Sequence, residues 1–249
     1  MLGPAVLEPI AARGWPAATS ESLGGWRLFA SAGFSGRLNT CWPLGDPGRP
    51  TGAAIAAAEA WYAARGLPST FKLTDRCTYP ADLAERLDAL GYAPSAATLT
   101  MVGALVAPDD PGVAIEAQVS EGFRRVFGDG VFGPRDDARE RLDALRRIPQ
   151  PRGFALTCVD GAPAAVGACA IDGDWAGLMA MRTSPAHRRL GLARRVFRAL
   201  CAFARASGAR HGYLQVEEDN TSALDLYRSE GFKTLYAYRY WARPEADRA

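Results

Sequence analysis

The sequence predicts an α/β protein in which helices flank a mixed β-sheet. Three strand-like runs separated by tight-turn residues occupy residues 154–182, and helices and strands then alternate up to residue 241. The chain before residue 107 repeats the last elements of that order at nearly constant spacing. Together, these observations predict an α/β design that is present once in full and once in a truncated form.

The composition is that of a soluble, folded protein. The 249 residues are 48% hydrophobic and 22% charged, and the net charge of +2 gives no general argument for nucleic acid or a membrane as partner. No apolar run reaches transmembrane length, and no basic segment precedes an apolar core as in a signal peptide. The five cysteines are scattered and odd in number, which suits small buried hydrophobes in a reducing compartment. The expected location is cytoplasmic.

Histidine is scarce, and this limits the chemistry that can be expected. The chain has two histidines, His187 and His211, which leaves little material for a zinc site or a Ser–His pair. No metal is therefore predicted. The position of His187 in a loop favours a phosphate or solvent contact over a role as catalytic base.

The segment 107–112 (A-P-D-D-P-G) is the best linker candidate, because it combines two prolines, a glycine and two acids. It divides the chain into an N-terminal domain, residues 1–106, and a C-terminal domain, residues 111–245, both of ordinary domain size. Turns at Asp160-Gly161 and Asp172-Gly173-Asp174 separate the three central strands of the C-terminal domain, and Asp-Gly is a strong hairpin signal. The expected elements of this domain are a strand at 112–117, helices at 120–127 and 136–148, strands at 154–159, 162–171 and 175–182, a loop at 183–190, a helix at 191–206, a strand at 213–217, a helix at 222–229 and a strand at 233–241.

The N-terminal domain resembles the end of the C-terminal one. Its expected elements are a helix at 51–65, a strand at 70–73, a helix at 83–90 and a strand at 97–102. Gly208 follows Gly66 by 142 residues, and Gly231 follows Gly91 by 140. No meander of strands is expected before the helix at 51–65, so the N-terminal domain is predicted to be a truncated copy. Two unrelated α/β segments are the alternative.

Positive charge is concentrated in one stretch. Residues 176–216 contain eight arginines and no acidic residue. The alternative explanation is a general preference for arginine, since Lys72 and Lys233 are the chain's two lysines. The length of the acid-free stretch favours a site for a polyanionic ligand.

Within this stretch, the start of the helix at 191–206 has the features of a pyrophosphate site. The pattern R-x-x-G-x-A at residues 188–193 opens the helix, and its small residues allow the backbone to approach a ligand closely. The free N–H groups of the first helical turn and the helix dipole favour an anion there. The pattern alone is unspecific, because residues 49–54 match it too.

A second motif downstream makes the first one specific. Residues 220–232 read N-T-S-A-L-D-L-Y-R-S-E-G-F. Taken with residues 183–193, they resemble the GNAT superfamily of N-acetyltransferases, whose motifs are V-x-P-x-x-[RQ]-x-x-G-x-[GA] and then N-x-x-A-x-x-x-Y-x-x-x-G-F, with Thr183 here in place of Val. The resemblance covers residues 111–245 and implies the splayed mixed sheet of acyl-CoA N-acyltransferases. The N-terminal copy has no Asn or Tyr at the matching places in residues 82–88, so we expect it to be degenerate.

The resemblance implies roles for the matching residues with acetyl-CoA as cosubstrate. Backbone amides at the start of the helix would hold the pyrophosphate, the strand before it would pair with the pantetheine arm, and Tyr227 would protonate the departing thiolate. A phenol with a pKa near 10 suits that last role, although a core aromatic is the alternative. The cofactor-binding residues so implied are Met181, Arg182, Thr183, Arg188, Arg189, Leu190, Gly191, Leu192, Ala193, Arg194, Asn220, Ala223 and Tyr227.

The acceptor side is less defined by the sequence. A lysine-like amine is protonated at neutral pH, so a general base is expected. Glu217 is the preferred candidate, with Glu218 and Glu116 as alternatives, because the strand at 175–182 lacks the glutamate usual in this family. The aromatic residues Trp26, Trp42, Trp61 and Tyr62 are expected to pack an interdomain core, with the lining of an acceptor pocket as the alternative.

The predicted function is direct acetyl transfer from acetyl-CoA to a primary amine in a ternary complex, because no cysteine stands beside a base to form an acetyl-enzyme. One alternative is a non-catalytic module that binds acyl-CoA. Another is a nucleic-acid-binding module that uses the arginine-rich stretch, although no nucleic-acid motif accompanies it. The chain is expected to be a monomer with internal pseudo-symmetry or a homodimer.

Overall fold

The computed structural model describes residues 3–106, 108–129 and 135–244. The helices within these ranges include two short 3-10 turns, η1 and η2, and they agree with the expected ones to within a few residues wherever a helix was expected. The helices are α1 (Pro4–Gly14), η1 (Gly36–Leu38), α2 (Thr51–Ala63), α3 (Leu83–Ala89), α4 (Glu121–Asp129), α5 (Arg135–Arg147), η2 (Pro185–His187), α6 (Leu192–Ala206) and α7 (Thr221–Ser229).

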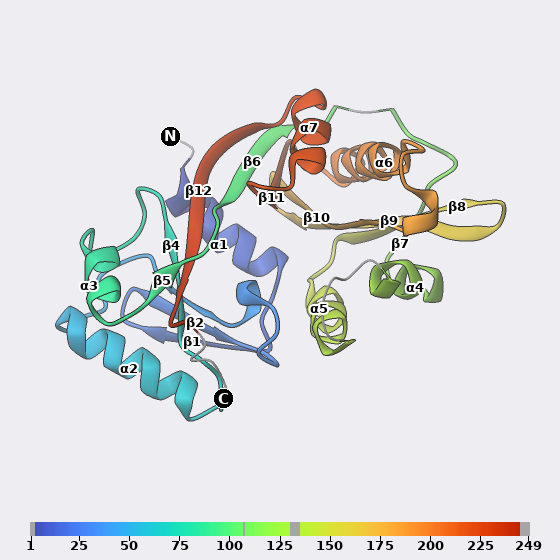
Figure 1. Cartoon of the computed structure of the whole chain (residues 1–249). Helices are drawn as coiled ribbons and strands as arrows, with labels where there is room; N and C mark the ends of the chain where they lie inside the picture. Colours follow the sequence, from blue (N-terminus) through green and yellow to red (C-terminus); the bar gives the residue numbers. More distant parts are fainter. Residues whose placement is uncertain (1–2, 107, 130–134, 245–249) are drawn as a thin grey trace.

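The strands join in one mixed sheet that runs through both halves of the chain (Figure 1). The strand order is β1-β2-β3-β4-β12-β6-β11-β10-β9-β8-β7, and the short β5 pairs with β12 beside this path. The mixed sheet flanked by helices that the sequence predicts is therefore confirmed. The strands are β1 (Thr19–Leu23), β2 (Trp26–Ala30), β3 (Thr40–Pro43), β4 (Thr70–Thr74), β5 (Ala93–Pro94), β6 (Thr98–Ala104), β7 (Ala114–Glu116), β8 (Arg152–Val159), β9 (Ala162–Asp172), β10 (Trp175–Thr183), β11 (His211–Glu217) and β12 (Lys233–Ala242).

The structure confirms the tight turn that the sequence predicts at Asp160-Gly161. Asp160 and Gly161 both have positive φ, +50° and +78°, and Val159 pairs with Ala162 across them. This is the two-residue turn that matches the twist of antiparallel strands. It fixes the register of β8 against β9, and so the position of β10, which leads into the candidate site.

The expectation that the N-terminal copy lacks a meander is wrong. The antiparallel strands β1, β2 and β3 precede α2, as β8, β9 and β10 precede α6. Their sequences gave no clear signal, because β1 is an exposed edge strand of polar residues and β3 has only four residues and ends in a proline. An edge strand needs no alternating apolar face, so its periodicity is weak.

The two halves exchange their last strands. The strand β6, which ends the N-terminal half, pairs with β11, and β12, which ends the C-terminal half, pairs with β4. The two exchanged strands also pair with each other at the centre of the sheet. Because β3–β4 and β10–β11 are both parallel pairs joined through a helix, the two halves are related by an approximate twofold arrangement about the β6–β12 pair. The division at residues 107–112 remains a prediction.

Helices cover both faces of the sheet in the C-terminal half. Figure 1 shows α6 and α7 on one face and α4 and α5 on the other. The amphipathic α6 buries Leu192, Val196 and Leu200 with residues of α7 and β9, whereas α4 and α5 bury Phe123 and Leu145 against β8 and β9. In the N-terminal half, Trp26 and Tyr62 lie in a core with residues of α2 and α3, and Trp61 and Trp241 of β12 pack against this core.

A buried carboxylate joins α5 to the N-terminal half. Glu140 is 3% exposed and accepts four hydrogen bonds from the segment between β2 and β3. The donors are the backbone N–H groups of Ala32 (2.6 Å), Gly33 (2.9 Å) and Ser35 (2.5 Å) and the side-chain Nδ2 of Asn39 (2.8 Å).

Replacing Glu140 with Gln is expected to lower the free energy of unfolding by about 2 kcal/mol, because an amide N–H would then face the N–H of Ser35. Urea denaturation followed by circular dichroism measures this. Glu121→Gln is the matched control, since Glu121 is exposed on α4, where it pairs with Arg124. An equal loss in both variants would contradict the importance of the buried hydrogen bonds.

Candidate functional site

The strands β10 and β11 diverge and leave an open edge in the sheet. They pair only from Trp175 to Gly177 on β10, although β10 continues to Thr183 and β11 to Glu217. A β-bulge in β10 contributes to the divergence: between Met179 and Arg182 this strand carries one residue more than β9. Ala180 in the bulge has φ +55°. Because a bulge bends its strand, the end of β10 presents free backbone groups that an extended ligand can pair with.

The loop after β10 leads to a helix start with unpaired amides. Gly191 caps α6 in the left-handed conformation, φ +73°, and Arg189 also has positive φ, +67°. A Cβ built on Gly191 meets no atom within 4 Å, so the space in front of the helix is open. Among the described residues, no backbone oxygen accepts from the amides of residues 189–194. These amides and the helix dipole form an anion-binding surface.

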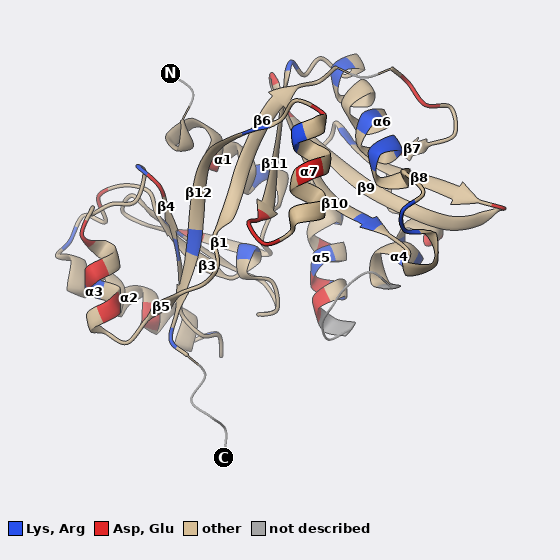
Figure 2. Cartoon of the chain, turned by 45° about the horizontal axis from the view of Figure 1, so that its top comes forward, with Lys and Arg blue, Asp and Glu red and all other residues tan. Residues whose placement is uncertain are grey.

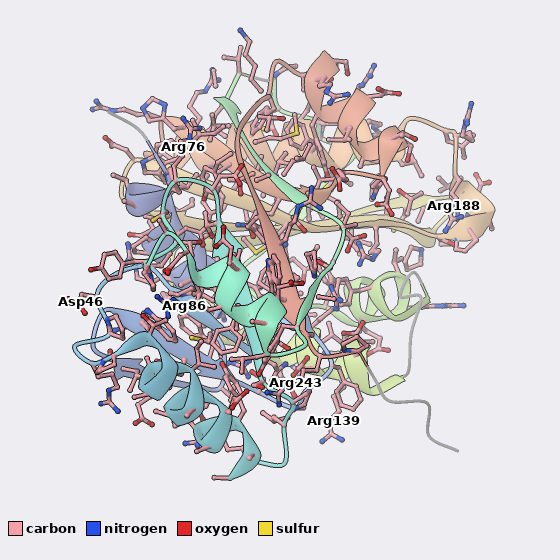
Figure 3. All side chains as sticks on the ribbon, turned by 60° about the vertical axis from the view of Figure 1, so that its left-hand side comes forward. Asp46, Arg76, Arg86, Arg139, Arg188 and Arg243 are labelled. Atoms are coloured by element: carbon pink, nitrogen blue, oxygen red, sulfur yellow. The ribbon has the colours of Figure 1, made fainter. Side chains whose placement is uncertain are left out.

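The arginines of this region divide into two groups. Figure 2 shows basic residues along α6. Three of them are paired with acids: Arg194 and Arg198 with Glu230 on the segment after α7, and Arg195 with Asp110. Arg188 is exposed in the loop before α6, at the edge of the molecule in Figure 3, and no ion pair holds it in the part of the chain that the structure describes. The free charge near the helix start therefore comes from Arg188 and Arg189, and Arg194 is largely engaged with Glu230.

Asn220 and Ala223 form the cap of α7. The Asn220 Oδ1 atom accepts from the N–H of Ala223 at 3.2 Å and from the hydroxyl of Ser222 at 3.3 Å. This is the usual use of asparagine at a helix start. The Asn220 side chain is exposed at the end of β11, beside the open edge, and its amide N–H groups have no partner among the described residues.

Tyr227 is buried between α6 and α7. It is 7% exposed, and its ring centroid lies 5.3 Å from that of Phe197. Burial raises the pKa of Tyr227 to about 12, and the charge of Arg182 lowers it in part. The phenol is therefore neutral and protonated at physiological pH, as a proton donor must be.

Arg182 extends from β10 to the face of the sheet that α4 and α5 cover. Its guanidinium carbon lies 5.6 Å from the centroid of the Phe127 ring, and its Nη1 donates to the Met181 carbonyl at 2.9 Å. Burial and then the charge of Arg141 lower the pKa of Arg182, against the opposing effects of Tyr227, Asp137 and Glu217. The resemblance implied a cofactor-binding role for Arg182 on the strand that would pair with the pantetheine arm. It did not indicate where the Arg182 side chain lies.

The three candidate general bases differ in their positions and partners. Glu217 is exposed at the end of β11, and its carboxylate is close enough to Arg182 to raise the pKa of that guanidinium. Glu218 is occupied, since it accepts from the N–H of Ala97 at 2.7 Å and pairs with Arg239. Glu116 lies on the edge strand β7, separated from β10 by β8 and β9. Of the three, Glu217 is the one that lies at the end of β11 and whose carboxylate has no hydrogen bond or ion pair to another described residue.

The second R-x-x-G-x-A match lies at the start of α2, the counterpart of α6. Gly52 there is inside the helix and lacks the positive φ of Gly191. The preceding loop packs against the β1–β2 turn, where the Asp46 carbonyl accepts from the N–H of Gly25 at 2.5 Å. This helix start thus differs in geometry from that of α6.

The described residues contain neither a metal-binding cluster nor a membrane-spanning helix. No group of three or more histidine, cysteine or acidic side chains there could hold a metal ion. None of the helices in the described ranges has the length and apolar character needed to cross a membrane.

Comparison with known proteins identifies relatives along nearly the whole chain. A family model described as "Probable histone acetyltransferase Rv0428c C-terminal" matches residues 5–241. The "Uncharacterized N-acetyltransferase YobR" of Bacillus subtilis is 25% identical over 241 residues, which cover 94% of this chain and 96% of that protein.

Solved structures give the same result for the fold. A GCN5-related N-acetyltransferase from Kribbella flavida has a TM-score of 0.72 at 18% identity, and the match covers 99% of this chain and 98% of the other. A tandem GNAT protein from the clavulanic acid biosynthesis pathway has a TM-score of 0.62 at 15% identity, over 89% and 79% of the two chains.

Proposed function

Since the chain belongs to the family described as "Probable histone acetyltransferase Rv0428c C-terminal", within the GNAT N-acetyltransferases, we propose that it transfers the acetyl group of acetyl-CoA to a primary amine. The observation that carries the proposal is the open edge between β10 and β11, together with the unpaired amides of α6, which follows β10 in the chain, and the protonated Tyr227 of α7, which follows β11. The anion site suits the pyrophosphate, the free strand edge suits the pantetheine arm, and the proton donor suits the departing thiolate.

Each element then has a role in the proposed reaction. The amides of residues 189–193 bind the pyrophosphate, with Arg188 nearby, and the backbone of Met181 and Thr183 pairs with the pantetheine arm. Asn220 donates its amide N–H to the cofactor across the open edge. The amine attacks the acetyl carbonyl, and Tyr227 gives its proton to the sulfur as the thiolate leaves.

The acceptor amine approaches from the α4–α5 face in this proposal. Glu217 removes the proton of the ammonium form, directly or through water, so that the nitrogen lone pair becomes available. The half-buried Arg182 on the same face adds positive charge beside the reacting carbonyl, where negative charge develops. The half containing α2 and α3 contributes the segment that Glu140 binds, and so helps to position α5.

The proposal is tested by following release of the CoA thiol from acetyl-CoA with a panel of amines. The panel contains free amino acids, polyamines, aminoglycosides and a lysine-containing peptide, and calorimetry measures acetyl-CoA binding in parallel. Turnover with at least one amine is the expected result. Binding with no turnover across the panel would favour an acyl-CoA-binding module, and absence of binding would overturn the cofactor assignment.

The pH profile supplies a separate prediction. Turnover is expected to rise with pH as the acceptor amine loses its proton, and to stay high to about pH 10, because the pKa of Tyr227 is about 12. Initial rates at saturating acetyl-CoA measure this, after preincubation at each pH to exclude inactivation. Glu217→Gln is expected to move the rising limb to higher pH. A descending limb below about pH 9 in the wild type would contradict Tyr227 as the proton donor.

A further inference from the structure

A cavity of about 670 Å³ lies away from the open edge, between α1, the strands β2 and β3, and the end of α5. This volume is in the range that accommodates small organic molecules. None of its lining residues belongs to β10, β11, α6 or α7. The lining residues are Ala5, Pro9, Ala12, Arg13, Pro16, Ala17, Ser20, Arg27, Phe29, Trp42, Leu44, Cys77, Arg147 and Pro149.

The lining combines an apolar body with one sign of charge. Seven of the lining residues are alanine, proline or leucine, and the rings of Phe29 and Trp42 meet edge to face with centroids 4.9 Å apart. The charged residues in the lining are three arginines, and no carboxylate accompanies them. A neutral apolar ligand would not need such a set of cations.

These arginines are only partly neutralised. Arg13 is paired with Asp172 at 2.6 Å. In the described ranges, Arg27 and Arg147 have no ion pair: Arg27 donates to the Ser22 hydroxyl, and the Nε of Arg147 donates to the Pro16 carbonyl.

Two buried donors in the lining residues also lack partners among the described residues. They are Nη2 of Arg147 and Nε1 of Trp42. The Lys72 Nζ atom lies 3.7 Å from the centroid of the Trp42 ring, and this buried ammonium is paired with the buried carboxylate of Glu8, so Glu8 is not free to balance the arginines. Positive charge is therefore left over at this cavity, together with N–H donors that native structures usually satisfy.

We propose that this cavity binds an organic carboxylate with an apolar or aromatic body. Arg27 and Arg147 hold the carboxylate, and Phe29 and Trp42 contact the body. Arginine suits this role because its planar donors match the two oxygens of a carboxylate. The site is distinct from the acetyl-CoA edge, so it does not depend on the proposed function.

The test is calorimetric titration of the full chain with three probes of equal size: 4-phenylbutyrate, 4-phenylbutanol and 4-phenylbutylamine. The acid is expected to bind at least about tenfold more tightly than the alcohol or the amine, since charge-assisted hydrogen bonds distinguish it. Arg147→Gln and Arg27→Gln are each expected to weaken binding of the acid by about tenfold. Arg146→Gln is the matched control, because Arg146 lies next in the chain, pairs with Asp143 and does not line the cavity.

Testing both Arg147→Gln and Arg27→Gln guards against misfolding. Arg147 also donates to the Pro16 carbonyl, so its loss can affect the fold, whereas Arg27 is exposed on β2. Ala17→Leu, which narrows the cavity from one of its lining positions, is expected to weaken binding of the acid. Equal binding of the three probes, no binding of the acid to the wild type, or an equal effect of Arg146→Gln would overturn the proposal. Titration in the presence and absence of acetyl-CoA is expected to give the same affinity.

Discussion

Replacing Tyr227 with Phe is expected to reduce turnover by about 10²–10⁴-fold, the range typical for loss of a positioned general acid. The phenylalanine ring can keep the contact with Phe197, so the fold and the affinity for acetyl-CoA should change little. The measurement is the initial rate of thiol release at saturating acetyl-CoA and amine, with acetyl-CoA binding measured by calorimetry on the same preparation.

Tyr213→Phe is the matched control for this variant. Tyr213 is also a buried tyrosine of the C-terminal half, but it lies on β11 against α1 and not beside α6. Its loss of a hydroxyl should leave turnover within about twofold of the wild type, because the group takes no part in the proton transfer. If both variants lose activity equally, the effect is one of packing, and Tyr227 is not the acid.

Replacing Gly191 with Glu is expected to weaken acetyl-CoA binding by about a thousandfold, because a carboxylate would stand in front of the amides that receive the pyrophosphate. The substitution also places a side chain at φ +73°, which costs about 1–2 kcal/mol by itself. Calorimetric titration with acetyl-CoA measures the loss.

Gly208→Glu separates the two effects. Gly208 ends the same helix, has φ +97° and also has open space around a built Cβ, so its backbone strain is comparable. It lies at the opposite end of α6 from the proposed site. We expect Gly208→Glu to lower stability but to keep acetyl-CoA affinity; a similar loss of affinity in both variants would remove the helix start as the pyrophosphate site.

Several features of the fold could be predicted because their signals are local. The Asp160-Gly161 turn needs two residues that tolerate positive φ, and the sequence contains them at the right place. The helix α6 repeats its apolar residues at helical spacing, and Gly191 and Asn220 mark the starts of α6 and α7. Each of these signals is contained in a few consecutive residues, so one sequence is enough to detect it.

The sequence did not predict which strands pair with each other in the sheet. Neither β6 nor β12 carries a local sign that it will join the sheet of the other half, because strand pairing is set by contacts between distant residues. For the same reason, the link from Glu140 to residues 32–39 could not be expected from helix periodicity.

The sequence by itself determined the order of the C-terminal elements and the family motifs, including Gly191, Asn220 and Tyr227. The tertiary structure alone decided that β10 and β11 diverge, that the charge of Arg182 lowers the pKa of Tyr227 in part, and that three arginines line a separate cavity. The physical reason is the range of the interactions. Turn, cap and helix preferences act over a few residues, whereas burial, charge pairing and the shape of a cavity depend on residues that only the folded chain brings together.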